Sequence, residues 1–200
     1  MQLYLVRHGE SEYNRIGEEA GSDSPLSELG WLQAERLGAW LATRGPFDAF
    51  YCSPLLRARQ TAEVLARYVP APAPTVLETL RESDFHMIDF LPRYAHPLDP
   101  ARGRPLPAPC EEYAGFRRQI EAALETIIGK ALEAGHQRLL VVSHGATMGT
   151  MIRTLLGVHH ISIWSQNCCV HCLVWEDSRW EIRYMNRKEF LADAVSKGGA

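Results

Sequence analysis

The chain has 200 residues, 46% of them hydrophobic, and a formal net charge of −3 at pH 7. This length and apolar content suit one compact domain over residues 1–200, and the weak negative charge excludes the broad basic surface that nucleic acids and anionic membranes attract. No apolar run approaches the length of a membrane span, and five cysteines, an odd number, do not suggest a secreted disulfide framework, so we expect a cytoplasmic protein.

Short apolar segments typical of buried strands recur along the chain, near residues 2–6, 48–52, 75–79 and 138–143. Two stretches between them carry apolar residues at helical spacing. The first consists of Gly30, Ala34, Leu37 and Leu41 and stops at Gly45-Pro46; the second consists of Phe116, Ile120, Ala123, Leu124, Ile127 and Ala131 and stops at Gly135. Strands that alternate with helices predict a layered α/β domain with a largely parallel sheet.

Two of the apolar segments, the first and the last, lead into a His-Gly pair: His8-Gly9 and His144-Gly145. In open α/β sheets, ligands bind beyond the carboxyl ends of the strands, and glycine lets the backbone turn sharply and approach a ligand closely. The residues after Gly145 read as a helix, whose first amides favour an anion. One histidine at a strand end is more often structural, whereas two at matching ends favour a functional site.

Ser53-Pro54 predicts the start of another helix, because serine caps a helix N-terminus and proline is tolerated at the first helical position. Arg57 and Arg59 follow within two turns. Residues two positions apart on a helix point about 200° apart, so both arginines cannot enter one pocket. The helical geometry alone does not choose between them.

A proline-rich stretch stands apart from these elements. Half of the twelve prolines fall between Pro92 and Pro109, where neither a regular helix nor a central strand can form. Long loops in compact domains are often functional, so a plain surface loop and a loop that covers a pocket are equally compatible with this composition.

The end of the chain predicts a β-hairpin, with alternating residues over 170–175 and 180–184 around "EDSR", so the sheet is expected to be mixed. Cys169 and Cys172 have C-x-x-C spacing, but on a strand their thiols point to opposite faces. Without a second pair they favour buried cysteines over zinc ligands. Packing is also favoured over metal binding for three further histidines, His159, His160 and His171.

Five motifs occur in a fixed order: "LVRHGESEYN", "SPLSELG", "SPLLRARQTA", "LRE" and "VVSHG". In this order and at these separations they resemble the histidine phosphatase superfamily, and the resemblance runs from residue 2 to about residue 157. It implies a three-layer α/β/α sandwich with a mostly parallel, mixed central sheet, the phosphoglycerate mutase-like fold.

The resemblance implies roles for four residues around a phosphoryl group. His8 resembles the nucleophile that becomes phosphohistidine, a task that suits imidazole because its neutral form is available near pH 7. Arg7 and Arg57 resemble phosphate clamps, so the resemblance selects Arg57 over Arg59. His144 resembles a companion histidine, expected to be cationic, that stabilises charge on the transferring group.

Three more residues complete the site that the resemblance implies. Glu82 resembles the acid that protonates the leaving alkoxide. Asn14 resembles a further phosphate donor, and Gly145 is expected beside the phosphate. Because two arginines and a histidinium supply the electrostatic stabilisation that phosphoryl transfer demands, we expect no metal and no other cofactor.

Two segments depart from the family pattern, "FHMIDF" at 85–90 and Cys110-Glu111-Glu112. Both usually border the organic part of the substrate, so the phosphate chemistry carries over while the substrate does not. We expect the proline-rich insertion, around 84–110, to border the active site. The segment "ISIWSQN" at 161–167 is a weaker candidate for substrate contact.

The favoured function is a metal-independent phosphomonoesterase that hydrolyses a small phosphorylated metabolite through a phosphohistidine intermediate. A 2,3-bisphosphoglycerate-dependent phosphoglycerate mutase is the alternative; such mutases usually carry a longer insert after the acid and a Gly-Trp segment after the first motif, and this chain lacks both. A non-catalytic phosphate-binding regulatory protein is disfavoured because every residue needed for the chemistry is present. A homodimer is left open.

Overall fold

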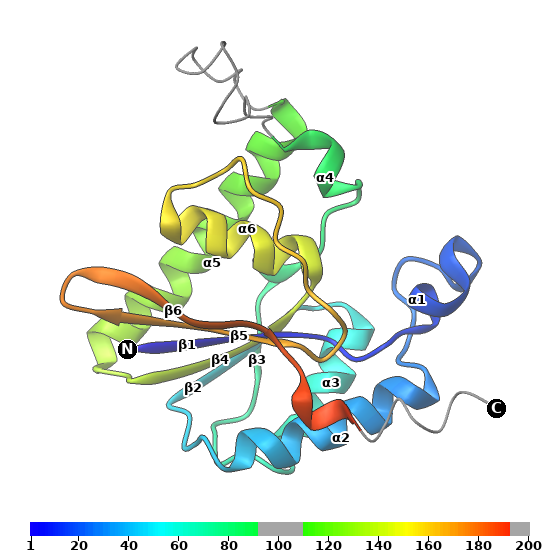
Figure 1. Cartoon of the computed structure of the whole chain (residues 1–200), viewed down its shortest axis with the longest axis horizontal. Coiled ribbons are helices and arrows are strands. Elements are labelled where there is room, and N and C mark those ends of the chain that lie inside the picture. Colours follow the sequence, from blue (N-terminus) through cyan, green and yellow to red (C-terminus); the bar gives the residue numbers. More distant parts are fainter. Residues whose placement is uncertain (92–109, 193–200) are drawn as a thin grey trace.

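The computed structural model describes residues 1–91 and 110–192, and within them a six-stranded sheet forms the middle layer (Figure 1). Its strands are β1 (Gln2–Arg7), β2 (Ala49–Cys52), β3 (Thr75–Val76), β4 (Arg138–Ser143), β5 (Val170–Glu176) and β6 (Arg179–Arg187). They lie in the order β3-β2-β4-β1-β5-β6. The first four are parallel, whereas β5 is antiparallel to both β1 and β6, so the prediction of a mostly parallel, mixed sheet is confirmed.

Helices cover both faces of this sheet, with α5 and α6 on one face and α2 and α3 on the other (Figure 1). The helices are α1 (Glu12–Ile16), α2 (Glu28–Ala42), α3 (Leu56–Ala66), α4 (Met87–Phe90), α5 (Glu111–Ala134) and α6 (Gly145–Leu156), with short 3-10 turns at Gly17–Ala20, Glu78–Leu80 and Glu189–Leu191. This arrangement is the three-layer α/β/α sandwich that the resemblance implies.

Alternation along the strands supplies both outer layers with apolar contacts. On β1, Leu3 and Leu5 pack in the core on the side of α5 and α6, whereas Tyr4 and Val6 pack in the core on the side of α2 and α3. All four side chains are buried. A strand covered on both faces needs apolar residues at every position, which is why it reads as an unbroken apolar run.

The two periodic helices, α2 and α5, bury the residues that the sequence pattern selects. Helix α5 ends at Gly135, whose left-handed backbone (φ 69°) glycine adopts without strain. Helix α3 begins at Leu56 rather than at Ser53-Pro54, so the predicted start is wrong by about half a turn. The Ser53 hydroxyl accepts a hydrogen bond from the Leu55 amide at 3.3 Å, in a turn that precedes the helix.

The C-terminal hairpin forms as predicted. Its two-residue turn consists of Asp177 and Ser178, both with positive φ, which matches the right-handed twist of the flanking strands. Cys169 packs on the side of α5 and α6 and Cys172 on the opposite side, so the predicted divergence of their thiols is confirmed.

Strand β3 is shorter than the predicted segment 75–79. Only Thr75 and Val76 pair with β2, after which the Leu77 amide donates to the Cys52 carbonyl at 3.0 Å. The chain then tightens into a 3-10 turn that buries Leu80. Burial of that leucine in the core therefore ends the strand early.

Gly9 has a packing role that differs from the predicted one. A Cβ added to Gly9 would lie 2.5 Å from the carbonyl oxygen of Gly30 on α2, and one added to Gly30 would lie 1.9 Å from the carbonyl oxygen of Glu10. The loop after β1 and helix α2 therefore meet backbone to backbone. Close approach to α2, rather than to a ligand, is what requires glycine here.

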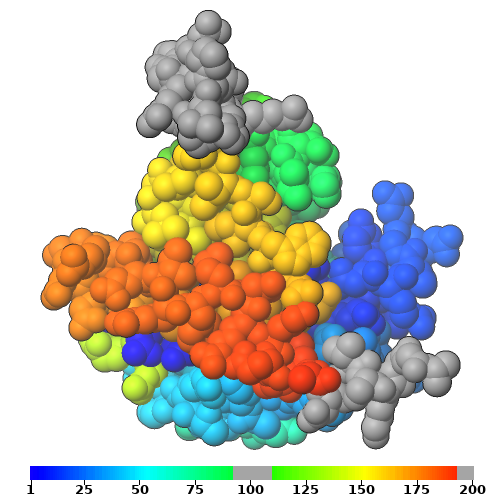
Figure 2. Space-filling model, viewed as in Figure 1, coloured from blue at the N-terminus to red at the C-terminus, as the bar shows by residue number. Residues whose placement is uncertain are grey.

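Figure 2 shows the surface of the molecule, from which the segment around α1 projects beside the segment that follows α6. The core of the proline-rich prediction, residues 92–109, lies outside the described residues. In the described ranges, none of the helices is both long and apolar enough to cross a bilayer.

Candidate active site

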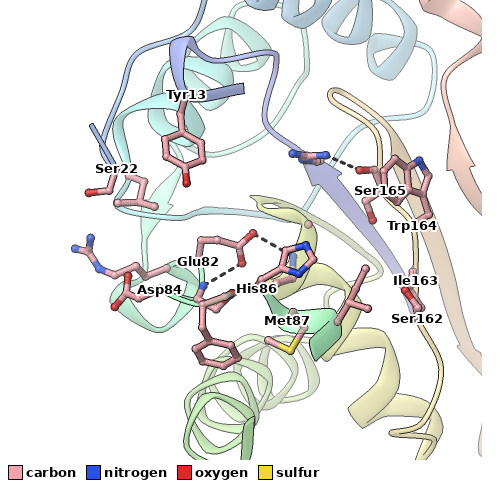
Figure 3. A pocket seen from close by; sticks show the side chains of 18 of the residues that line it. Tyr13, Ser22, Glu82, Asp84, His86, Met87, Ser162, Ile163, Trp164 and Ser165 are labelled. Carbon is pink, nitrogen blue, oxygen red and sulfur yellow. Dashed lines mark hydrogen bonds between the residues drawn. The ribbon is translucent and has the colours of Figure 1, made fainter. Parts of the chain in front are cut away.

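A cavity of about 770 Å³ opens at the carboxyl ends of the parallel strands. Its deep end is formed by Arg7, Arg57, Glu82 and Gly145, with His8 in contact with Arg57. Its outer rim, shown in Figure 3, is formed by Tyr13 of α1, by residues between Asp84 and Leu91, and by the loop 162–165. The described start of the predicted insertion, 84–91, thus borders this cavity.

The sheet register brings the two His-Gly pairs together. Arg7 lies opposite Ser143 on adjacent parallel strands, so His8 and His144 leave the sheet side by side. Their ring centroids are 5.1 Å apart, and both residues are buried. The structure therefore brings together the histidines that the sequence pairs.

The hydrogen bonds of His8 determine its tautomer. Its Nδ1 lies 2.7 Å from the Gly9 carbonyl oxygen, which can only accept, so Nδ1 carries the proton. In the neutral ring Nε2 therefore carries the lone pair, and it accepts from Nε of Arg57 at 3.2 Å. A neutral, oriented Nε2 is the form that a nucleophile requires.

The surroundings of His8 favour this neutral form. Burial, followed by the positive charges of Arg7 and Arg57, holds the pKa of His8 well below its usual 6.5, against a smaller opposing effect of the Gly9 hydrogen bond. The two arginines beside His8 thus help to keep its imidazole unprotonated.

Arg7 is held from behind by a chain of polar contacts. Its Nη1 donates to the Ser165 carbonyl at 2.6 Å, and the Ser165 hydroxyl lies 2.9 Å from Nε2 of the buried His171. Nδ1 of His171 accepts from the Asn186 amide at 3.1 Å, so Nε2 carries the proton and donates to Ser165. Burial lowers the pKa of His171 to about 4, which keeps this bridge neutral.

His144 is the N-cap residue of α6, and its Nε2 lies 2.7 Å from the Ser53 hydroxyl. Burial, followed by repulsion from a protonated His8 and by the positive charges of Arg57 and Arg7, holds the pKa of His144 well below 6.5. The protein alone therefore favours neutral His144 rather than the expected cation. Only a nearby anion, such as a phosphoryl group, would reverse this preference.

Glu82 caps helix α6. Its Oε1 accepts from the Ser83 amide, the Thr147 amide and the Thr147 hydroxyl at 3.0–3.1 Å, and its Oε2 accepts from the Ala146 amide at 3.1 Å. The anion that the sequence predicts at this N-terminus is therefore the protein's own carboxylate. Figure 3 shows the Glu82 carboxylate directed into the cavity.

The remaining predicted residues differ in their placement. Gly145 lines the cavity, and a Cβ there would meet the Arg7 guanidinium at an ordinary 3.9 Å. Asn14 is not among the lining residues; its Oδ1 accepts from the Ser11 amide and from Asn167. Arg59 is exposed, which agrees with the selection of Arg57. A phosphate contact of Asn14 stays a prediction.

Sequence reasoning named Ser53, His171 and the segment 161–167 but missed their supporting roles, namely Ser53 behind His144 and the Ser165–His171 pair behind Arg7. Five buried side-chain atoms in the described ranges have no hydrogen-bond partner, and two of them, Nε of Arg7 and Nδ1 of His144, belong to predicted site residues. Arg7 lines the deep end and His144 directly precedes Gly145, which also lines it, so an anionic oxygen bound there would be a partner for them. Across residues 1–91 and 110–192, no group of three His, Cys, Asp or Glu side chains is arranged to hold a metal.

Comparison with known proteins identifies the family. The family model of the histidine phosphatase superfamily, branch 1, matches residues 3–188. An adenosylcobalamin/alpha-ribazole phosphatase of Salmonella typhi is 32% identical over 176 residues, which cover 82% of this chain and 84% of that protein.

Two solved structures share the fold. A phosphoglycerate mutase from Bacillus anthracis has a TM-score of 0.73 at 22% identity, covering 98% of this chain and 96% of its own. A phosphoserine phosphatase from Entamoeba histolytica, in complex with 3-phosphoglyceric acid, has a TM-score of 0.68 at 22% identity, covering 95% and 98%.

Proposed function

The chain belongs to the histidine phosphatase superfamily, and on this basis we propose that it is a phosphomonoesterase that hydrolyses a small phosphorylated metabolite through a phosphohistidine intermediate. One observation carries the proposal. His8 is fixed as the Nδ1–H tautomer, with its Nε2 lone pair directed at the cation that would clamp the phosphate.

In the first step, Nε2 of His8 attacks phosphorus while the bond from phosphorus to the leaving oxygen breaks. Arg57 donates to that same Nε2 in the protein alone, so it must release the lone pair before attack. A phosphoryl oxygen is a stronger acceptor for guanidinium than an imidazole nitrogen is. Substrate binding therefore draws Arg57 off His8 and activates the nucleophile.

The leaving alkoxide needs a proton, and we assign its supply to Glu82, which lines the cavity. Oε1 already accepts three hydrogen bonds, whereas Oε2 accepts one, so Oε2 is the oxygen with room for a proton. A dianionic phosphoryl group beside the carboxylate favours protonation because two like charges repel.

In the second step, water attacks the phosphohistidine and the bond between phosphorus and Nε2 breaks. Glu82, now ionised, accepts the proton of that water, and phosphate leaves. Arg7, Arg57 and a His144 made cationic by the phosphoryl group stabilise the oxygens in both steps. The residues that the proposal uses supply this charge without a metal, so activity should survive exhaustive treatment with EDTA.

The alternative function is a phosphoglycerate mutase, because a protein of that name shares this fold. A phosphatase releases free phosphate at the rate at which substrate disappears. A mutase protects its phosphohistidine from water and needs a bisphosphorylated primer. With 3-phosphoglycerate, primer and EDTA present, rapid formation of 2-phosphoglycerate with little free phosphate would contradict our proposal, as would the absence of any turnover across a panel of phosphomonoesters.

The cysteines support a proposal about location. All five are free, and four of them are buried, which fits a reducing compartment such as the cytoplasm. A homodimer stays a prediction, which sedimentation of the purified protein would test.

A further inference from the structure

Arg153 of α6 is a buried cation in the wall of the cavity, outside the deep end. The residue is only 2% exposed, yet it lines the cavity. Its Nε donates to the Tyr113 hydroxyl at 3.2 Å, its Nη1 to the Ile161 carbonyl at 3.3 Å and its Nη2 to the Thr150 hydroxyl at 2.7 Å. All three acceptors are neutral.

No carboxylate balances this charge in the described part of the chain, because none of the ion pairs found there includes Arg153. Glu121, the nearby acid that acts on His159, is paired with Arg117 at 2.7 Å. His159, which contacts the Tyr113 hydroxyl, cannot balance the charge either, because an imidazole is neutral or cationic. Burying a cation without an anion is costly, so this arrangement calls for an explanation.

The two arginines of the deep end share the same features. Arg57 is buried and Arg7 is partly buried; both donate to backbone carbonyls, and neither forms any of the ion pairs of the described residues, although the charge of Glu82 acts on both. Under the proposed function, the anion that they bind is the phosphoryl group of the substrate. By the same physical reasoning, the missing anion of Arg153 is a second charged group of the substrate.

The surroundings leave room for such a group. A guanidinium has five N–H donors, and the three contacts of Arg153 use one on each nitrogen, which leaves one on each terminal nitrogen. Gly149 lies against Nη1, at 3.3 Å from the position of its missing Cβ, so a larger residue there would crowd the guanidinium.

The position on α6 fixes the geometry of the ligand. Gly145 begins the helix at the deep end, and the Arg153 guanidinium lies at the level of Gly149, about 6 Å further along the axis. Figure 3 shows Met87 and Ile163 of the same wall at the opposite end of the view from Tyr13. A short molecule with two anionic groups a few bonds apart would span this distance.

We propose that Arg153 receives a carboxylate of the substrate, and that the natural substrate is a phosphorylated carboxylic acid. This inference rests on the proposed function and deepens it. The two free N–H groups would bind the two carboxylate oxygens, a planar match that a lysine cannot reproduce.

Matched substrates test the inference directly. O-phosphoserine and O-phosphoethanolamine differ only in the carboxylate, and 3-phosphoglycerate and glycerol 3-phosphate differ by a carboxylate in place of a hydroxymethyl group. We expect the carboxylated member of each pair to have the higher kcat/KM, by roughly 10- to 100-fold, as for hydrogen bonds to a charged group. Arg153→Met should abolish this preference while retaining hydrolysis of p-nitrophenyl phosphate, and Arg153→Lys should restore part of it.

Arg118→Met is the control, because it removes an exposed arginine of the adjacent helix α5 that does not line the cavity. It should leave the preference intact. Two results would overturn the inference: an equal loss of kcat/KM on both members of each pair in Arg153→Met, or no preference for the carboxylate in the unaltered protein. Either result would mean that Arg153 only holds the loop at Ile161 in place.

Binding to the His8→Ala variant separates this inference from the proposed function. Calorimetry of 3-phosphoglycerate against glycerol 3-phosphate requires no turnover. Tighter binding of the carboxylate that depends on Arg153 supports the inference even if the unaltered protein hydrolyses neither compound. Equal binding of the two compounds contradicts it, even if both are hydrolysed.

Discussion

The deep end and the outer rim of the cavity come from different parts of the fold. The residues of the deep end come from the ends of β1 and β4, from the start of α3 and from the segment after the 3-10 turn Glu78–Leu80. At its base His8 is 2% exposed and Arg57 is 7% exposed. The rim comes from α1, the short α4 and a loop, and its Trp164 is 70% exposed. The chemistry is therefore held by the core, whereas the surface that meets the rest of the substrate is held by short elements that can change without disturbing the sheet.

Replacing the nucleophile should give the largest effect and should affect every substrate alike. We expect His8→Ala to lower turnover on the order of 10⁴-fold or more and to abolish the acid-labile, base-stable phosphoryl label that brief mixing with labelled substrate leaves on the protein. A label that persists in the variant would mean that another residue is the nucleophile. The proposed separation of chemistry at the deep end from substrate contact at the rim would then be wrong.

Glu82→Gln tests whether the deep end includes proton transfer. Turnover of alkyl phosphates should fall about 10²- to 10⁴-fold, as for loss of a general acid. The loss should be much smaller with p-nitrophenyl phosphate, whose leaving group hardly needs a proton. Equal losses on both substrates would mean that Glu82 acts only as the cap of α6.

Arg57→Gln should shift the pH dependence as well as the rate. The positive charge of Arg57 lowers the pKa of His8, so its removal raises that pKa towards 6.5 and protonates more of the nucleophile on the acid side. The acid limb of kcat/KM should move to higher pH, with a loss of roughly 10- to 100-fold at neutral pH from the missing phosphate contact. Titration of the His8 imidazole by NMR provides the direct check, and an unchanged or lower pKa would be the contrary result.

Trp164→Ala should give the smallest effect and should depend on the substrate. An aromatic contact at the rim contributes about 2- to 10-fold in kcat/KM for substrates that reach it. Hydrolysis of the smallest esters should stay unchanged. Trp175→Ala provides the control, since that tryptophan packs against Trp180 on the hairpin and does not line the cavity. An equal loss of kcat/KM on small and larger esters with Trp164→Ala would mean that the rim also affects the geometry of the deep end.

Much of the deep end could be predicted from sequence because it lies at the ends of strands. The apolar runs before His8 and His144 mark buried parallel strands, and such strands place their carboxyl ends at one edge. The choice of Arg57 over Arg59 came from the family motif, not from periodicity. The structure supplies the physical basis, since Arg57 contacts His8 whereas Arg59 is exposed.

The supporting contacts could not be predicted, because they join residues far apart in the chain through loops. Ser53 lies 91 positions from His144, and Ser165 lies 158 positions from Arg7. No local pattern marks such a pair. For the same reason the N-terminal amides of α6 were expected to bind an unspecified anion, whereas the fold brings Glu82 to them.

The backbone contact between Gly9 and Gly30 has a consequence for how the protein loses activity on heating. No side chain lies between helix α2 and the loop that carries His8. Because the two backbones are in direct contact, the loop cannot move independently of α2. Further hydrogen bonds tie it to its surroundings, from the Gly9 amide to Thr61 and from the Ser27 amide to the Glu10 carbonyl. Local melting of this loop would require α2 to separate from the sheet, so thermal inactivation should coincide with cooperative unfolding of the whole sandwich instead of preceding it.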